Sequence, residues 1–373
     1  MKASYEIGIV GGGLAGLTAG IHLSQLGFSV VIFERQSYPH HKVCGEYVSK
    51  EVLPYFDSLG IDVQLEQLPQ LNRLHLTTEK GKELWQDLPL GGFGISRYVL
   101  DELLYKKALA NGVQFVFNKV QQVAFEGNSF IITTSNKEIY ESTVVLGAWG
   151  KRSSLDKAAS RPFIQRRSPW MGVKAHFEGD FADDVIALHN FRGGYCGMSK
   201  VEQHRINACY LVDTRVFQEY GSVDALEAAV LMKNPFWAAW RTAAKPLFEQ
   251  PLIISQISFE RKAPIVDHML MIGDSAGLIH PLCGNGMAMA IHAAKLAAEG
   301  CEQFFHQHQN RQQLERAYQT IWKKTFQARL QTGRRIQQLL LRENMSNYMI
   351  SLAQLFPGLV PKIIKKTHGL PIG

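Results

Sequence analysis

A thiol, an ammonium group and a carboxylate lie close together in the segment HHKVCGEY, at Lys42, Cys44 and Glu46. A cysteine thiol near positive charge can act as an acid or a nucleophile, so Cys44 is a candidate proton donor in catalysis. A free cysteine is also commonly a small buried hydrophobe, and both interpretations stay open. The neighbouring His40 and His41 have no further ligand at metal-binding spacing, so we predict no metal site.

The chemistry of this loop depends on the segment before it, YEIGIVGGGLAGLTAGIHLSQLGFSVVIFER, whose pattern is strand, tight turn, helix and second strand. The glycines of its GxGxxG turn have no side chains, so a pyrophosphate can approach the backbone and the helix N-terminus closely. Glu34 ends the second strand, where a carboxylate can accept hydrogen bonds from ribose hydroxyls. We therefore predict a dinucleotide site. Its predicted contacts are Gly11, Gly13, Leu14, Ala15, Gly16, Glu34 and Arg35.

A second motif distinguishes FAD from NAD. In HMLMIGDSAGLIHPLCGNGMAMAIHAAKLAAEG, an apolar strand ends at Gly273-Asp274, and a Gly-x-Gly pair then opens a long alanine-rich helix. An aspartate at the strand end can hold a ribityl hydroxyl, and the helix N-terminus suits the flavin N1–C2=O edge, which becomes anionic on reduction. NAD has neither group. We predict non-covalent FAD, with contacts at Asp274, Gly284, Gly286 and Met287.

From about residue 5 to about residue 310, these motifs resemble the FAD-binding frame of the p-hydroxybenzoate hydroxylase superfamily, most closely the geranylgeranyl reductases. The resemblance implies an FAD-dependent oxidoreductase in which the KVCGE segment crosses the flavin. It also implies that GISRYVLDELL supplies an arginine and that the first strand of GGYCGMSKVEQHRINACYLV faces the substrate. The cofactor contacts implied by the resemblance are Lys42, Cys44, Gly45, Arg97 and Val120, and the implied substrate contact is Tyr195.

One departure from the family pattern concerns the source of electrons. The family has a Gly-Ala-Asp-Gly element where this chain has VVLGAWGKRSS, with Trp149 in place of the aspartate. The resemblance implies that this element serves NADPH in the aromatic hydroxylases, so we do not expect their mode of nicotinamide use here. No second GxGxxG follows a predicted strand, which argues against a separate NAD(P)H domain. The electron donor is then either transiently bound NAD(P)H or a reduced protein.

The order of these patterns predicts an α/β protein. We expect a Rossmann-like, three-layer FAD-binding domain with a parallel sheet, an inserted α+β substrate domain covered by an antiparallel or mixed sheet, and C-terminal helices. The predicted ranges are 1–70, 96–160 and 255–310 for the FAD-binding domain, 71–95 and 161–254 for the substrate domain, and 311–373 for the helices. Alternation in RINACYLV predicts a strand with Ile206, Ala208, Tyr210 and Val212 on one face and Asn207, Cys209 and Leu211 on the other.

Charge and cysteine usage limit the partners and the compartment. The formal net charge is +7, but the basic residues are dispersed until the C-terminal third, so we predict no nucleic-acid partner. Five cysteines without CxxC spacing favour a reducing cytoplasm, and neither a signal peptide nor a membrane-spanning run is recognisable. The C-terminal cations could face solvent or lie on an anionic bilayer as a peripheral membrane contact. They are Arg334, Arg335, Arg342, Lys362, Lys365 and Lys366.

Three functions are compatible with these features. The first, which we favour, is C=C reduction of a small hydrophobic substrate by flavin hydride, because KVCGE and HPLCGNG resemble the reductase branch. The second is a flavin monooxygenase acting on an aromatic or polyketide substrate; a halogenase is less expected, because no Trp-x-Trp-x-x-Pro segment is present. The third is a flavin-binding protein without catalysis. The sequence leaves open the substrate, an electron-donor protein and the oligomeric state.

Overall fold

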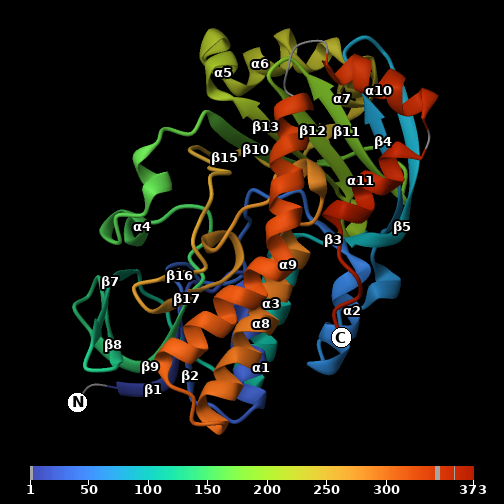
Figure 1. The fold of residues 1–373 in the computed structure, drawn as a ribbon. Coiled ribbons are helices and arrows are strands. Elements are labelled where there is room, and N and C mark those ends of the chain that lie inside the picture. The colour runs from blue at the N-terminus through green and yellow to red at the C-terminus, as the bar shows by residue number, and fades with distance from the viewer. Residues whose placement is uncertain (1–2, 341–344, 357) are drawn as a thin grey trace.

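Two β-sheets organise the chain in the computed structural model, which describes residues 3–340, 345–356 and 358–373. The first sheet has the order β16-β17-β9-β1-β2-β6, with the β7–β8 hairpin joined to β9 (Figure 1). All its pairs from β17 to β6 are parallel. Its strands are β1 (Ala3–Val10), β2 (Val30–Phe33), β6 (Gln114–Val116), β7 (Val120–Glu126), β8 (Ser129–Thr134), β9 (Ile139–Gly147), β16 (Ile265–Val266) and β17 (Met269–Met271).

Helices cover this parallel sheet, as the apolar character of its central strands requires. All four residues of β2 are buried, and so are the last four of β1, as expected for strands enclosed on both faces. The helices α1 (Leu14–Gln25), α3 (Arg97–Ala110) and α8 (Gly286–His306) pack side by side, and α9 (Arg311–Leu340) lies on α8. Figure 1 shows α9 extending from these helices toward the second sheet.

The second sheet is mixed, since β4 and β11 pair in parallel and the other neighbours are antiparallel. Its order is β14-β10-β13-β12-β11-β4-β5-β3, and β15 pairs with β10. Its strands are β3 (Tyr47–Ser49), β4 (Gln70–Thr77), β5 (Glu83–Gly94), β10 (Trp170–Glu178), β11 (Val185–Phe191), β12 (Gly194–Lys200), β13 (Ile206–Asp213), β14 (Lys245–Pro246) and β15 (Leu252–Ile254).

The two faces of the second sheet differ as the alternation in β13 predicts. Ile206, Ala208, Tyr210 and Val212 belong to one apolar cluster with residues of the helices that follow β13, which confirms that they share a face. Leu211 belongs to a separate cluster with Tyr195. The helices on the first face are α5 (Thr214–Tyr220), α6 (Val223–Ala229) and α7 (Pro235–Ala243).

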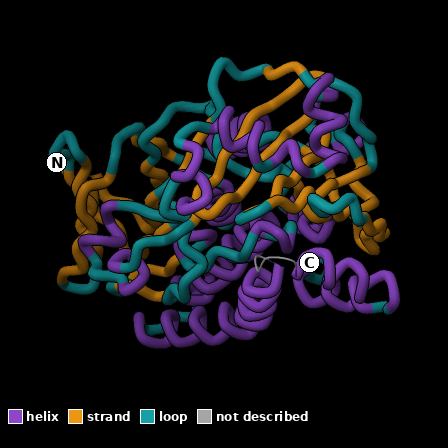
Figure 2. The backbone as a smooth tube through the Cα atoms, turned by 90° about the horizontal axis from the view of Figure 1, so that it is seen from above, coloured by secondary structure: helices purple, strands orange, loops and turns teal. Residues whose placement is uncertain are grey.

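The predicted α/β fold with a Rossmann-like unit is confirmed. The predicted domain ranges stay a prediction; β3, within the range 1–70, pairs with β5 of the second sheet. The remaining helices are α2 (Leu53–Ser58), α4 (Ser154–Ala158), α10 (Met345–Leu355) and α11 (Leu359–Thr367). Figure 2 shows the C-terminal helices along one side of the molecule. Arg342 lies outside the described residues. Among the described helices, none is long and apolar enough to cross a membrane.

Candidate functional site

The glycine turn between β1 and α1 leaves room that side chains would fill. Gly11 has a φ of +110°, and an added Cβ there would lie 2.4 Å from a backbone oxygen. Gly13 precedes α1 and gives its N–H groups no side-chain cap. An added Cβ on Gly13 would lie 3.7 Å from Arg97 Nη2 and 3.9 Å from Lys42 Nζ. The uncapped helix N-terminus and two cations thus meet at Gly13, which suits the pyrophosphate of FAD.

One buried carboxylate holds both cations. Arg97 donates from Nε and Nη2 to the two oxygens of Asp101, each at 2.7 Å, and Lys42 Nζ donates to Asp101 Oδ2 at 2.9 Å. Burial acts to raise the pKa of Asp101, but Arg97 and Lys42 outweigh it and lower that pKa, so the carboxylate stays ionised. Lys42 and Arg97 carry two positive charges and Asp101 carries one negative charge. This group, called the phosphate cradle below, therefore attracts phosphate.

Glu34 lies beside the glycine turn, where the sequence places the adenosine ribose. Its Oε2 accepts a hydrogen bond from Gly12 N at 2.9 Å, and its Oε1 accepts one from Arg35 N at 2.8 Å. The Arg35 side chain is exposed. Leu14 and Ala15 are buried, with 4% and 6% exposure, so their backbones rather than their side chains are suited to meet a cofactor.

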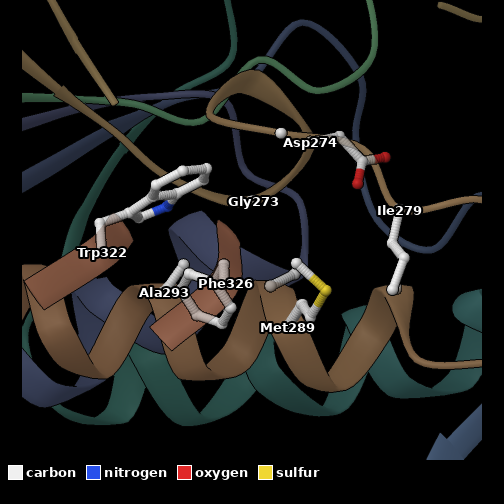
Figure 3. A pocket seen from close by; sticks show the side chains of 10 residues that line it. Gly273, Asp274, Ile279, Met289, Ala293, Trp322 and Phe326 are labelled. Atoms are coloured by element: carbon white, nitrogen blue, oxygen red, sulfur yellow. The ribbon is translucent and has the colours of Figure 1, made fainter. Parts of the chain in front are cut away.

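The second motif forms a short turn above the start of α8. Asp274 lies in a 3₁₀ turn directly after β17, Gly284 has a φ of +62°, and α8 begins at Gly286. Figure 3 shows the Asp274 carboxylate directed away from Trp322, on the side of Ile279. The orientation leaves that carboxylate available to a ribityl hydroxyl. Met287, which follows Gly286, is buried.

The loop of residues 42–46, called the Cys44 loop, is attached both to the segment that follows β9 and to the second sheet. Lys151 Nζ donates to Val43 O at 3.0 Å, and Asn207 Nδ2 on β13 donates to Cys44 O at 3.2 Å. An added Cβ on Gly45 would meet no atom within 4 Å, so the backbone there faces open space. A planar ring can approach such a backbone closely. The sequence pattern did not indicate Lys151 or Asn207, because both contacts join segments more than 100 residues apart.

Glu46 holds the loop from inside. The sequence groups Glu46 with the loop residues, but its carboxylate is fully buried between Lys174 and His176 of β10. It accepts from Lys174 Nζ, from Arg97 N at 2.8 Å, and bonds His176 Nε2 at 2.7 Å. Burial acts to raise the pKa of Glu46, whereas Lys174 and His176 outweigh it and lower that pKa. Glu46 therefore stabilises the loop and the start of α3.

An apolar wall lies on the face of the second sheet opposite its helices. Tyr195 is buried there and clusters with Leu188, Leu211, Ile257, Phe259 and Leu278. The ring of His280 lies 5.9 Å from that of Tyr195. Burial lowers the pKa of His280 to about 3, so its imidazole is neutral near pH 7. The side chains of this wall are buried and uncharged, and the role of Tyr195 as a substrate contact stays a prediction.

Two further positions that the sequence singled out are Val120 and Trp149. Val120 is buried at the start of β7, and its role as a cofactor contact stays a prediction. Trp149, which replaces the family aspartate, donates from Nε1 to Asp156 Oδ1 at 3.0 Å, and Asp156 also accepts from Arg161 Nη1 at 2.7 Å. The indole is therefore anchored in the fold.

Among the described residues, no group of three or more His, Cys, Asp or Glu side chains could hold a metal ion.

The structure brings most predicted site residues together in two groups. The glycine turn, Glu34, Lys42 and Arg97 surround the N-terminus of α1, while Asp274 and Gly286 lie at the N-terminus of α8. The Cys44 loop has contacts to the sheet that carries Tyr195. Their individual roles stay predictions.

Known proteins resemble the chain along most of its length. It is 23% identical to conditioned medium factor receptor 1 of Dictyostelium discoideum, over 87% of this chain and 68% of that protein. It is 23% identical to tryptophan 2-halogenase of Chondromyces crocatus, over 80% and 61%. It is 21% identical to digeranylgeranylglycerophospholipid reductase of Methanococcus vannielii, over 99% and 97%.

Solved structures share the fold. The flavin-dependent brominase Bmp2 superposes with a TM-score of 0.79 at 16% identity, covering 97% of this chain and 93% of that one. A geranylgeranyl bacteriochlorophyll reductase-like protein from Thermoplasma acidophilum gives 0.77 at 16% identity, covering 100% and 94%. Residues 4–320 match the FAD binding domain family. The glycine turn and the Asp274 turn lie within this range. The chain therefore belongs to the FAD binding domain family.

Proposed function

We propose that this FAD-dependent protein reduces a C=C bond in a small hydrophobic substrate. The observation that carries the proposal is the hydrogen bond from Asn207 to the Cys44 carbonyl, which attaches the Cys44 loop to the strand, β13, that also carries part of the uncharged wall around Tyr195. Asn207, which bonds the Cys44 carbonyl, shares a face of β13 with Cys209 and Leu211. Leu211 pairs with Tyr195 across the sheet. A substrate resting on the wall would therefore lie on the same face of the sheet as the loop that carries the thiol.

The residues of the chain have separate tasks in this reaction. FAD, when bound, supplies a hydride equivalent to one carbon of the double bond. Lys42, Arg97 and the α1 N-terminus hold its phosphates, and the open backbone at Gly45 leaves room for its ring. The Cys44 thiol gives a proton to the other carbon and regains one from solvent. The apolar wall orients the substrate and excludes water.

Oxygen dependence tests the reaction class. Reduced enzyme, prepared with dithionite under argon so that the natural donor does not matter, is mixed with long-chain isoprenoid alkenes. Reoxidation of the flavin without oxygen, together with a saturated product that has gained two hydrogens, supports the proposal. Substrate turnover that requires dioxygen and inserts oxygen or halide would instead establish the monooxygenase alternative.

Replacing Cys44 is expected to slow alkene-dependent flavin reoxidation by about 100-fold or more, the usual contribution of a positioned acid. Cys44→Ala removes the proton, and Cys44→Ser keeps a donor of much higher pKa. Both variants should bind FAD and be reduced at wild-type rates, because Cys44 is only partly buried and the hydrogen bonds of the phosphate cradle join Lys42 and Arg97 to Asp101. Stopped-flow absorbance under argon measures each step.

Cys196→Ala is the matched control, since Cys196 lies in the apolar cluster on the opposite face of the second sheet. It should reoxidise at the wild-type rate. A wild-type rate in Cys44→Ala would show that the thiol is only part of the cavity wall.

We also propose a peripheral contact with anionic membranes, where a lipid-like substrate resides. Exposed apolar side chains on and after α10, Tyr348, Leu355 and Phe356, are 64%, 74% and 61% exposed. The α11 lysines are exposed as well, and both helices contact β5. Replacing Lys362, Lys365 and Lys366 together with glutamine is expected to weaken vesicle binding by about 100-fold, from about 1 kcal/mol per lysine.

Flotation with phosphatidylserine vesicles at low and high salt measures this binding. The matched control replaces three exposed lysines of the first half of the chain, Lys106 in α3, Lys137 in the connection between β8 and β9, and Lys157 in α4. Equal loss in both triple variants, or binding that salt does not weaken, would contradict a specific C-terminal contact.

A further inference from the structure

A second cavity lies between the loop at 260–264 and α9, with a volume of about 200 Å³. A water molecule occupies about 30 Å³ in the liquid, so the cavity has room for a group of several heavy atoms. It is lined by four cationic side chains and by one carboxylate, that of Glu260. The cations are Arg261, Lys262, Lys323 and Arg334.

The positive charge of this cavity is not neutralised by the protein. Glu260 Oε1 is paired with Arg166 Nη1 at 3.4 Å. In the part of the chain that the structure describes, none of the four cations forms an ion pair with a carboxylate. Burial lowers the pKa of Arg334, and the neighbouring charge of Arg261 lowers it further, while Glu260 acts to raise it. Arg261 and Arg334 thus repel each other, and an anion bound between them would relieve that repulsion.

Lys262 connects the cavity to the flavin side. Its Nζ donates to Asp274 O at 2.8 Å and to Lys151 O at 2.9 Å, and it lies 4.4 Å from the centre of the Phe163 ring. Burial lowers the pKa of Lys262 to about 8, although Asp274 and Asp156 act to raise it. An anion in the cavity would favour the charged form of this lysine.

The inner side of the cavity is apolar and closely packed. Trp322 and Leu330 of α9 are buried, and an added Cβ on Gly277 would lie 3.0 Å from Leu330 and 3.2 Å from Trp322. Gly277 and Trp322 also line the small gap beneath the Asp274 turn (Figure 3). They therefore form a wall between that gap and the basic cavity, so this site is separate from the predicted ribityl position.

We propose that this cavity binds the phosphate or diphosphate group of a small ligand whose apolar or aromatic part rests on the Trp322 side. Two arginines match phosphate oxygens bidentately, and two lysines add point charges. A phosphorylated hydrophobic substrate and a nicotinamide dinucleotide both carry this chemistry. The inference does not depend on which bond the flavin reduces, so it can fail while the proposed reaction stands.

The test is calorimetric titration of the flavin-loaded protein with inorganic diphosphate. Lys323→Gln/Arg334→Gln is expected to weaken binding by about tenfold for each cation removed. The matched control, Arg316→Gln/Lys324→Gln, removes the same charge from exposed positions of the same helix that do not line the cavity. It should bind diphosphate with nearly the wild-type Kd. An unchanged flavin absorbance spectrum in each variant shows that the fold is retained.

Further titrations distinguish the sources of the phosphate group. If NADPH binds and depends on Lys323 and Arg334, the ligand is the electron donor, and flavin reduction by NADPH should slow in that variant while reduction by dithionite does not. If a long-chain prenyl diphosphate shows the dependence instead, the ligand is the substrate; if inorganic diphosphate alone shows it, the ligand is the free anion. Equal weakening in both double variants, or no binding of any probe to the wild type, would overturn the proposal.

Discussion

Replacing Gly13 with alanine is expected to weaken FAD binding by about 100-fold or more while leaving the fold intact. The added methyl would lie 3.7 Å from Arg97 Nη2 and 3.9 Å from Lys42 Nζ, which is ordinary van der Waals contact. It would also occupy the space between the α1 N-terminus and these cations, where the pyrophosphate is predicted to lie. A 100-fold loss corresponds to about 2.7 kcal/mol of binding free energy. Fluorescence titration of the apoprotein with FAD measures the Kd.

Two other glycines provide the comparison. An alanine at Gly16 would place its Cβ 2.0 Å from Gly11 O, so Gly16→Ala should lower the unfolding temperature as well as FAD affinity. Gly300, within α8, has its nearest contact at 3.5 Å, on Leu314, so Gly300→Ala should change neither property. Wild-type FAD affinity in Gly13→Ala would place the pyrophosphate elsewhere.

Glu46→Gln is expected to lower the free energy of unfolding by about 3–5 kcal/mol, the usual cost of removing one partner from a buried ion pair. Lys174 has no exposed side-chain area, and its ammonium group would lose the carboxylate that neutralises it. His176 and the backbone N–H of Arg97 would lose a charged acceptor as well. Urea unfolding at pH 7 measures the change.

The effect of Glu46 should depend on pH in one direction. Its pKa is lowered in the folded protein, because Lys174 and His176 outweigh the opposing effect of burial. A carboxylate with a lowered folded pKa contributes stability above its unfolded pKa of about 4.3, and that contribution is lost as the pH falls through the folded value. The difference between wild type and Glu46→Gln should therefore be full above about pH 5 and shrink in more acidic solution.

An exposed ion pair is the control for this variant. Arg73 and Asp184 pair at 2.6 Å, but their side chains are 46% and 41% exposed. Asp184→Asn should cost no more than about 1 kcal/mol, as exposed pairs do. A loss in Glu46→Gln as small as that in Asp184→Asn would contradict the stabilising role of the buried group.

The sequence by itself determined the features that depend on neighbouring residues. The GxGxxG turn identified Gly11, Gly13 and Gly16, because tight turns and helix N-termini are built within a few residues. Alternation in β13 assigned Tyr210 and Leu211 to opposite faces, because successive side chains of a strand point in opposite directions. Both predictions concern local backbone geometry, and for that reason one segment was sufficient to make them.

Only the tertiary structure decided what each loop touches. Glu46 and Lys174 are 128 positions apart, and Cys44 and Asn207 are 163 apart, so no local pattern relates them. The family resemblance placed Glu46 in the KVCGE segment that crosses the flavin, whereas the fold buries its carboxylate against β10. The basic cavity likewise brings together Arg261 of the 260–264 loop and Arg334 of α9. Periodicity specifies which face of an element is apolar, but strand order and helix packing specify which distant charges meet.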